Sequence, residues 1–236
     1  SGDNTYNLSL TFSDASNNEM NAYAQTIIID SVAPIISSNY GTTVSVKENI
    51  YNKERVAEFT ITESNFSASD VQLNVTAKDI TGANVDISSK GYAEYVKNDA
   101  NWVHNGNIHT IKLPDFDIDA IYTVDISYTD LAKNSANDYP VDEFIVDMSD
   151  ATNVKVEYST SIVDKVLENI TFGFYKANVI VTVTAEDITS GVDYFVITYV
   201  NKDGDNNSNK ATYTTEKLTA VQDVNNKNIF TATHAV

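Results

Sequence analysis

Carboxylates are the side chains of this sequence with the greatest capacity for chemistry. The chain holds 33 acidic residues against 15 basic ones, and its formal charge is -18. Several of the acids stand near the ends of predicted strands, where the loops of neighbouring units would meet. Calcium binds six to eight oxygen atoms, so two or three carboxylates with carbonyls and water are sufficient. We therefore predict calcium ligands at Asp30, Asp70, Asp130, Asp147 and Asp150.

These acids are expected to form two groups, one at each junction between units. The first group would contain Asp30 together with Glu63, Asp70, Asp130 and Asp138. The second would contain Asp79, Asp115 to Asp119, Asp147 and Asp150. The alternative interpretation is that the acidic surface only keeps a secreted protein soluble.

Residues suited to catalysis are sparse. The three histidines are His104, His109 and His234, and no G-x-S-x-G nucleophile motif is present. His104 and His109 would lie diagonally on one face of a hairpin, where a transition-metal site would need further ligands. Paired acids such as Asp115 and Asp117 could serve a glycosidase, but loop positions explain them without that chemistry. We therefore expect a protein that is not an enzyme.

Aromatic residues provide a second candidate binding site. Trp102 is the single tryptophan, and Tyr92 and Tyr95 stand nearby in the sequence. Together they could form a platform on which a sugar ring stacks. The alternative is that Trp102 packs in the core or under a loop, as buried aromatic residues do.

Composition limits the kind of partner. An acidic chain with a pI of about 4.3 repels phosphate backbones and anionic lipid heads, so nucleic-acid and peripheral membrane roles are not expected. No apolar run approaches the roughly 18 residues that a membrane span needs, and we predict no membrane insertion in this segment. The chain has no cysteine, which is compatible with an exported Gram-positive protein. Any targeting or anchoring segment is expected outside these residues.

The chain repeats itself with a period of nearly 120 residues. Phe12–Asn18 returns as Tyr128–Asn134, an offset of 116, and Ile27–Asp30 returns as Phe144–Asp147, an offset of 117. A further similarity links Val75–Thr81 to Val183–Thr189. We predict the closing strands of one unit in residues 1–32, a whole unit in 33–147, and the front part of another in 148–236. Arrays of this kind usually act as spacers, stalks or multivalent binders.

Alternation of apolar and polar residues predicts strands throughout. Inward sets are expected at Ala57, Phe59 and Ile61, at Val71 to Ala77, at Tyr122 to Tyr128, and at Val179 to Ala185. Further strands are predicted through Val85 to Val96, and at most one helical turn at Ser67–Asp70. Asn105-Gly106 predicts a two-residue turn that would pair His104 with Asn107 and Trp102 with His109. About seven short strands per unit indicate an all-β fold of tandem β-sandwiches, incomplete at both ends.

Three motifs resemble the bacterial immunoglobulin-like repeats of large Gram-positive surface proteins of the adhesin type. They are the junction Ile27–Pro34, the segment Arg55–Asp70, and the closing segment Tyr122–Asn134. Ala132-Lys133-Asn134 stands where the family usually has a glycine, and the second junction, Asp147–Thr152, lacks the proline of the first. The resemblance implies tandem immunoglobulin-like sandwiches in a wall-attached or secreted protein.

The resemblance also implies an extracellular spacer or adhesive role. The alternatives are a module that binds carbohydrate or a host protein, and an accessory β-sandwich of a secreted glycoside hydrolase. The expected partners are neighbouring repeats of the same chain or of another copy. Residues 1–32 could supply the two strands that 148–236 lacks, either because the segment is cut from a longer array or because copies exchange strands head to tail.

Overall fold

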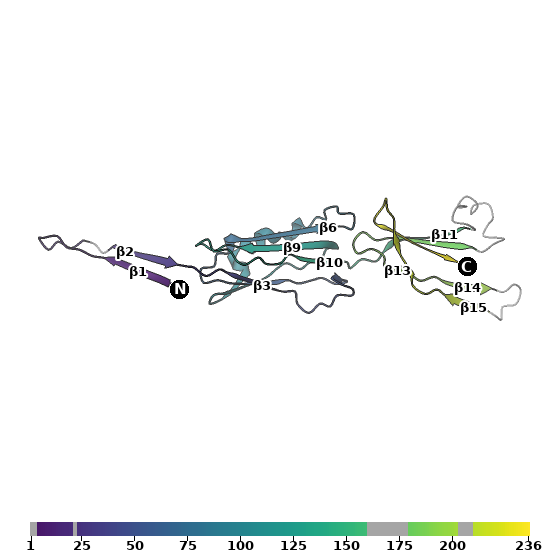
Figure 1. The fold of residues 1–236 in the computed structure, drawn as a ribbon, viewed down its shortest axis with the longest axis horizontal. Coiled ribbons are helices and arrows are strands. Elements are labelled where there is room, and N and C mark those ends of the chain that lie inside the picture. The colour runs from purple at the N-terminus through teal and green to yellow at the C-terminus, as the bar shows by residue number, and fades with distance from the viewer. Residues whose placement is uncertain (1–3, 21–22, 160–178, 203–209) are drawn as a thin grey trace.

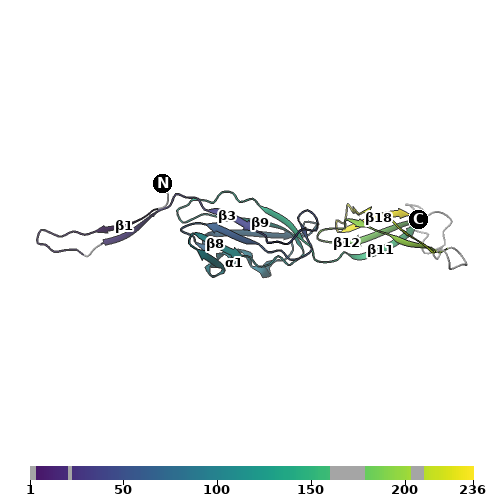
Figure 2. The ribbon, with the colours of Figure 1, turned by 90° about the horizontal axis from the view of Figure 1, so that it is seen from below.

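The protein is an elongated all-β molecule with three parts in a row. The computed structural model describes residues 4–20, 23–159, 179–202 and 210–236. A hairpin (residues 4–29) projects from one end of a middle unit (residues 33–147), and a C-terminal unit (residues 148–236) lies at the other end (Figures 1 and 2). The hairpin and the C-terminal unit therefore lie on opposite sides of the middle unit.

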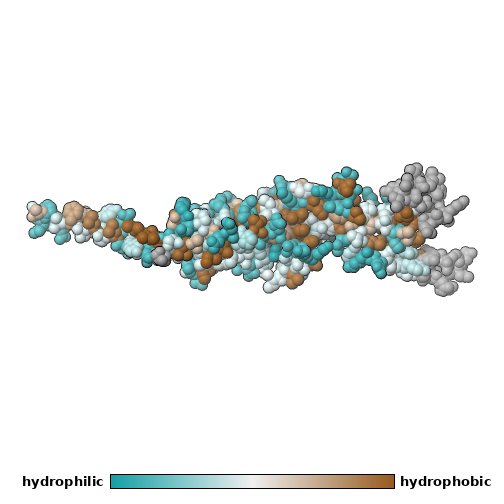
Figure 3. Space-filling model, in the orientation of Figure 1, coloured by the Kyte–Doolittle hydropathy of each residue, from teal (hydrophilic) through white to brown (hydrophobic). Residues whose placement is uncertain are grey.

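The hairpin consists of two antiparallel strands, β1 (Asn4–Leu10) and β2 (Tyr23–Ile29). Tyr6 pairs with Ile27, and Leu8 pairs with Gln25. Both faces of the hairpin are exposed, and apolar side chains lie at its surface (Figure 3). The alternation that should bury one face is present, but nothing in the described structure covers that face.

The middle unit contains two four-stranded sheets with a shared core. One sheet has the order β3 (Ile35–Asn39), β5 (Glu58–Thr62), β8 (Ile108–Lys112) and β7 (Trp102–Asn105). The other has the order β4 (Ile50–Tyr51), β10 (Asp142–Val146), β9 (Ala120–Tyr128) and β6 (Val71–Lys78). β4 runs parallel to β10, and the other pairs are antiparallel.

The core lies between these sheets, as the alternation predicted. Phe59 and Ile61 of β5 are fully buried against Tyr122 and Val124 of β9 and Phe144 of β10. The rings of Tyr122 and Phe144 stack with centroids 5.4 Å apart. Each such side chain contributes roughly 1.5–3 kcal/mol by leaving water. The core therefore depends on strands from both sheets.

Short helices connect β6 to β7, and here one predicted strand is wrong. Instead of a strand through Val85 to Val96, the chain forms the helix α1 (Tyr92–Lys97) between two 3₁₀ turns, η2 (Ser88–Lys90) and η3 (Asp99–Asn101). Tyr92 and Val96 are four residues apart, so the helix brings both to the same buried face. The predicted single helical turn before β6 is present as η1 (Ala68–Asp70).

The hairpin between β7 and β8 has a different register from the predicted one. His104 pairs with His109, and Trp102 pairs with Ile111, so the turn residues are Gly106 and Asn107. Gly106 takes a φ of 64°, and a glycine at the first central position suits the type II′ turn of a tight hairpin. The two histidines are thus directly opposite, with Nδ1 atoms 2.8 Å apart, and not diagonal.

The C-terminal unit repeats the first of the two sheets. Its four-stranded sheet has the order β11 (Thr152–Ser159), β12 (Ile180–Glu186), β18 (Ile229–Ala235) and β17 (Val221–Gln222). Val181, Val183 and Ala185 of β12 point inward, as predicted. Two-stranded sheets join β13 (Tyr194–Phe195) to β16 (Leu218–Thr219), and β14 (Thr198–Lys202) to β15 (Lys210–Thr214).

β12 is the counterpart of β5 and not of β6, so the predicted match between Val75–Thr81 and Val183–Thr189 is wrong. The amide of Glu63, just after β5, donates to the Asn107 carbonyl at 2.8 Å. The amide of Asp187, just after β12, donates to the Asn228 carbonyl at 2.9 Å in the same way. Alternating strands share short sequences because they share a pattern, and only the neighbouring strands distinguish them.

Direct contacts join the middle and C-terminal units. The Ile80 amide donates to the Ile188 carbonyl at 2.8 Å, and Lys47 forms a salt bridge with Asp193. A β-carbon added to Gly191 would lie 2.6 Å from Phe230 and 3.2 Å from Ile80. The junction is therefore closely packed around a glycine with a φ of 78°.

We predict that Gly191→Ala destabilises the C-terminal unit by about 1–3 kcal/mol more than Gly41→Ala destabilises the middle unit. Both glycines have positive φ, but a β-carbon on Gly41 meets no atom within 4 Å. Denaturant unfolding of the two variants, followed separately for each unit, measures the difference. Equal losses would show that the contact with Phe230 is not tight.

Candidate metal centre

Three carboxylates meet at the junction between the hairpin and the middle unit. Asp30 follows β2, Glu63 follows β5, and Asp130 stands two residues after β9. One oxygen from each lies within 4.8 Å of the others. Only 4% of Glu63 and 1% of Asp130 are exposed, whereas Asp30 is half-buried. The three strands end at this junction, and this places the acids together.

Amide groups orient these carboxylates. The Asp130 carboxylate accepts hydrogen bonds from the Asn134 amide nitrogen and from Asn134 Nδ2, both at 2.8 Å. Asn134 Nδ2 also donates to the Asp30 carbonyl at 3.2 Å. Asn65 donates from Nδ2 to Asp30 and from its backbone nitrogen to Glu63. Two asparagines thus link the end of the hairpin to the middle unit.

This geometry suits a hard divalent cation. Calcium lies 2.3–2.6 Å from its oxygen ligands, so two ligands of one ion are at most about 5 Å apart. The separation of up to 4.8 Å among the three oxygens meets that condition. Negative charges held this closely inside a protein also repel one another, and a cation would relieve that repulsion. Backbone carbonyls and water would have to complete the coordination shell.

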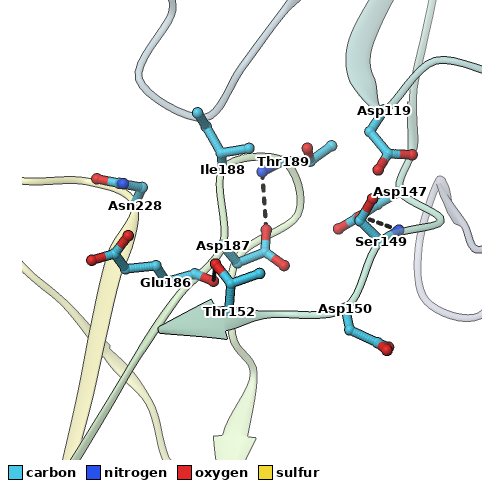
Figure 4. Close-up of a pocket in the computed structure, with 10 residues that line it drawn as sticks. All are labelled: Asp119, Asp147, Ser149, Asp150, Thr152, Glu186, Asp187, Ile188, Thr189 and Asn228. Atoms are coloured by element: carbon cyan, nitrogen blue, oxygen red, sulfur yellow. Dashed lines mark hydrogen bonds between the residues drawn. The ribbon is translucent and has the colours of Figure 1, made fainter. Parts of the chain in front are cut away.

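The second junction carries acids around a pocket of about 300 Å³. Asp147 follows β10 and Asp187 follows β12, and Asp119, Asp150 and Glu186 also line the pocket (Figure 4). The Asp187 carboxylate accepts from the amides of Thr189 and Gly191 at 2.9 and 2.8 Å. Asp147 accepts from the Ser190 amide at 3.1 Å. The pocket therefore combines residues of the middle and C-terminal units.

The two junctions are related by the repeat. Asp147 occupies the position of Asp30, and Asp187 occupies that of Glu63. The Glu63 carboxylate accepts a hydrogen bond from the amide of Asn65, two residues further on. The Asp187 carboxylate accepts one from the amide of Thr189, also two residues further on. Among the described residues, only Asp30, Glu63 and Asp130 form a cluster of three acidic or histidine ligands within 4.8 Å.

The predicted ligands are divided between these places. Asp30 and Asp130 belong to the first cluster, and Asp147 and Asp150 line the second-junction pocket. Asp70 lies on η1, outside the cluster of three. Asp187 was not among the predicted ligands, because the mistaken match of Val75–Thr81 with Val183–Thr189 placed it opposite Asp79. An acid directly follows both β5 and β12, Glu63 in one case and Asp187 in the other. This shared position in the sequence could have identified Asp187.

The aromatic residues proposed as a sugar platform lie inside the middle unit. Trp102 is 5% exposed, and its Nε1 donates to the Val96 carbonyl at 2.7 Å. Tyr92 is 4% exposed and stacks on Phe116, and burial raises the pKa of its hydroxyl. Tyr95 is half-buried on the same helix. The platform prediction is corrected, because buried ring faces leave no place for a sugar.

No protein-family model and no curated protein matches this sequence. Among the residues that the structure describes, no helix has both the length and the apolar character to cross a membrane. The role of the chain is therefore inferred from its own residues and geometry.

Burial raises the pKa of the Asp147 carboxyl above its usual 3.8, and the charges of Asp187 and Asp119 add to the rise. A raised pKa means that ionisation of Asp147 opposes folding at neutral pH, and that this cost disappears as the pH falls through the folded-state pKa. We predict that Asp147→Asn raises the melting temperature at pH 7 in the presence of a chelator. The advantage should shrink as the pH approaches 3.8.

The matched control is Asp150→Asn, which alters an exposed acid in the same segment between β10 and β11. Its melting temperature should stay close to that of the wild type. Differential scanning calorimetry across this pH range measures both variants. An Asp147→Asn variant that is no more stable than the wild type at pH 7 would contradict the raised pKa of Asp147.

Proposed function

We propose that this chain is a non-enzymatic structural segment of an extracellular bacterial surface protein, built from tandem immunoglobulin-like units that serve as a spacer or stalk. The observation that carries the proposal is the end-to-end arrangement of the units, with hydrogen-bonded and acidic junctions between them (Figures 1 and 2). Such an arrangement separates its two ends, which is what a spacer does.

The strand order of the middle unit supports the immunoglobulin-like part of the proposal. Leaving out the short β4, the unit's strands in chain order are β3, β5, β6, β7, β8, β9 and β10. One sheet then contains the first, second, fifth and fourth strands, and the other contains the third, sixth and seventh. This division matches the ABED and CFG sheets of a constant-type immunoglobulin sandwich, and the match supports the proposal.

The histidines support a structural role. Both ring nitrogens of His109 are engaged, Nδ1 with His104 and Nε2 with the Glu63 carbonyl at 2.8 Å. Phe66 stacks on the His109 ring with centroids 4.3 Å apart. His109 thus holds the loop after β5 against β8, and its ring is occupied by packing.

A surface location is supported by the acidity, the absence of cysteine and the resemblance of the repeat motifs to Gram-positive surface proteins. In this setting, calcium at the first junction would connect Asp30, at the end of the hairpin, to Glu63 and Asp130 of the middle unit. One ion would then restrict the angle between two consecutive units.

We predict that calcium stabilises the chain and stiffens the first junction. A native-state site adds roughly 2.7 kcal/mol at a concentration 100 times its Kd. The melting temperature should therefore rise between chelator and millimolar calcium, and small-angle scattering should show a narrower range of lengths. Glu63→Gln should abolish both changes, because it removes a buried ligand charge.

The matched control is Glu58→Gln, which alters an exposed acid at the start of β5, the strand that precedes Glu63, and should leave the calcium response intact. A calcium response that is equal in the two variants would place the ion elsewhere. A wild-type melting temperature that is unchanged by calcium would remove calcium from the proposal. A scattering profile of a compact molecule would contradict the spacer role.

A further inference from the structure

The turn end of the β7–β8 hairpin brings two histidine rings into direct contact. His104 and His109 are cross-strand partners, one pair further from the turn than Asn105 and Ile108. Side chains of directly opposed residues lie close together on one face of a sheet. The Nδ1 atoms of the two rings are 2.8 Å apart. The hairpin therefore fixes two potential metal ligands at a short and defined separation.

The outer nitrogen of each ring faces an oxygen atom. His109 Nε2 lies 2.8 Å from the Glu63 carbonyl oxygen, which can only accept, so Nε2 is the donor. His104 Nε2 lies 3.6 Å from the Asp99 carboxylate, whose charge favours a proton on that nitrogen. These two oxygens favour the tautomer in which Nδ1 carries the lone pair of each ring.

Two lone pairs at a separation of 2.8 Å repel each other unless a proton or a metal ion lies between them. An oxygen acceptor on the outer nitrogen is also the usual arrangement around a histidine that binds a metal, because it fixes the tautomer and the direction of the ring. Both histidines of this hairpin have such an oxygen. The pair is therefore arranged as metal ligands are.

The packing of His109 leaves this arrangement accessible. Phe66 stacks on one face of the His109 ring, with the two planes inclined by 13°. The Nδ1 lone pair lies in the plane of the ring, so a ring stacked on the face does not cover it. The side chain of His104 is 39% exposed and provides the approach from solvent.

The separation of the two nitrogens indicates which metal suits the pair. A metal ion lies about 2.0–2.1 Å from a histidine nitrogen, so two nitrogens 2.8 Å apart enclose an angle of about 90° at the metal. This angle is that of neighbouring positions in a square-planar or tetragonal site, whereas a tetrahedral ion would hold the nitrogens about 3.3 Å apart. Copper(II) and nickel(II) favour the first geometry, and copper binds more tightly.

We propose that His104 and His109 form a copper(II) site through their two Nδ1 atoms. Water would complete the coordination shell, which leaves positions open to a further ligand. The site uses nitrogen ligands, whereas the cluster of Asp30, Glu63 and Asp130 offers carboxylate oxygens. It needs only the hairpin and the loops beside it, so it does not depend on the spacer role.

Titration of copper(II) chloride into the full chain, followed by electron paramagnetic resonance, tests the site. The wild type should bind copper with the hyperfine pattern of two imidazole nitrogens. Loss of an outer partner of a metal ligand commonly costs roughly 10–100-fold in affinity, so His104→Gln, which removes a ligand, should cost at least as much. Its spectrum should show one imidazole nitrogen at most.

The matched control is His234→Gln, which removes the histidine of β18 in the C-terminal unit and should bind copper like the wild type. Two-nitrogen binding that persists in His104→Gln, or that is lost in His234→Gln, would overturn the proposal. A wild-type spectrum with oxygen ligands only would do the same. Because the His104 side chain is partly exposed, the metal-free melting temperature of His104→Gln should stay near that of the wild type.

Nitrogen-15 NMR of the imidazole rings provides a measurement without a variant. In the metal-free protein, His109 should carry its proton on Nε2, and a proton confined to Nδ1 would contradict the site. Copper binding is also measured in millimolar calcium, where the two-nitrogen spectrum should persist. Loss of that spectrum in calcium would place copper on the carboxylates and overturn the proposal. A melting temperature that does not respond to calcium, with copper binding retained, would remove only the calcium site.

Discussion

An apolar sheet face has to be covered by a second sheet, and the architecture of this chain follows from that requirement. In the middle unit the requirement is met within one chain, because β9 and β10 place Tyr122, Val124 and Phe144 against Phe59 and Ile61. The first hairpin and the C-terminal unit each hold only part of such a pair of sheets. Within the described residues, the apolar side chains of β1 and β2 stay exposed.

The junctions use the positions where strands end. The strands of a sandwich begin and end at its two opposite ends. An acid that follows one strand is therefore brought close to acids that follow other strands ending at the same end. Asp30, Glu63 and Asp130 meet in this way, and Asp147 and Asp187 are brought to one pocket. Close buried carboxylates are costly unless a proton, a hydrogen bond or a cation offsets the charge. This cost is the physical reason to expect that pH and divalent ions affect the stability of the junctions.

These two properties reinforce each other in an array. Coverage of apolar faces determines which strands belong together, and hydrogen bonds to Asp30 and Asp147 help to join consecutive units. The hydrogen bonds from Asn65 and Asn134 to Asp30 show that one unit's last strand is anchored on the next unit's loops. A spacer that is built in this way would gain stiffness at its joints without disulfide bonds.

Local pattern was sufficient to predict much of this protein. Alternation identified the inward residues of β5, β6, β9 and β12, and the repeated turn motif by itself matched Asp14 with Asp130. Sequence alone also pointed to Asp30 and Asp130 as members of one group. It did so because side-chain direction in a strand and the hydrogen bonds of a tight turn depend on residues close in sequence.

Tertiary structure decided what depends on distant neighbours. The burial of Trp102 and Tyr92 follows from helix α1, which forms because its apolar residues find a core to cover. The equivalence of β12 with β5 is visible only from the strands beside them, since Val75–Ala77 and Val183–Ala185 carry the same three residues. The same is true of Asp187, whose place beside Asp147 is set by packing between units. Sequence determines which face of a strand is apolar, but the fold decides what that face meets, because the strands that cover it lie far along the chain.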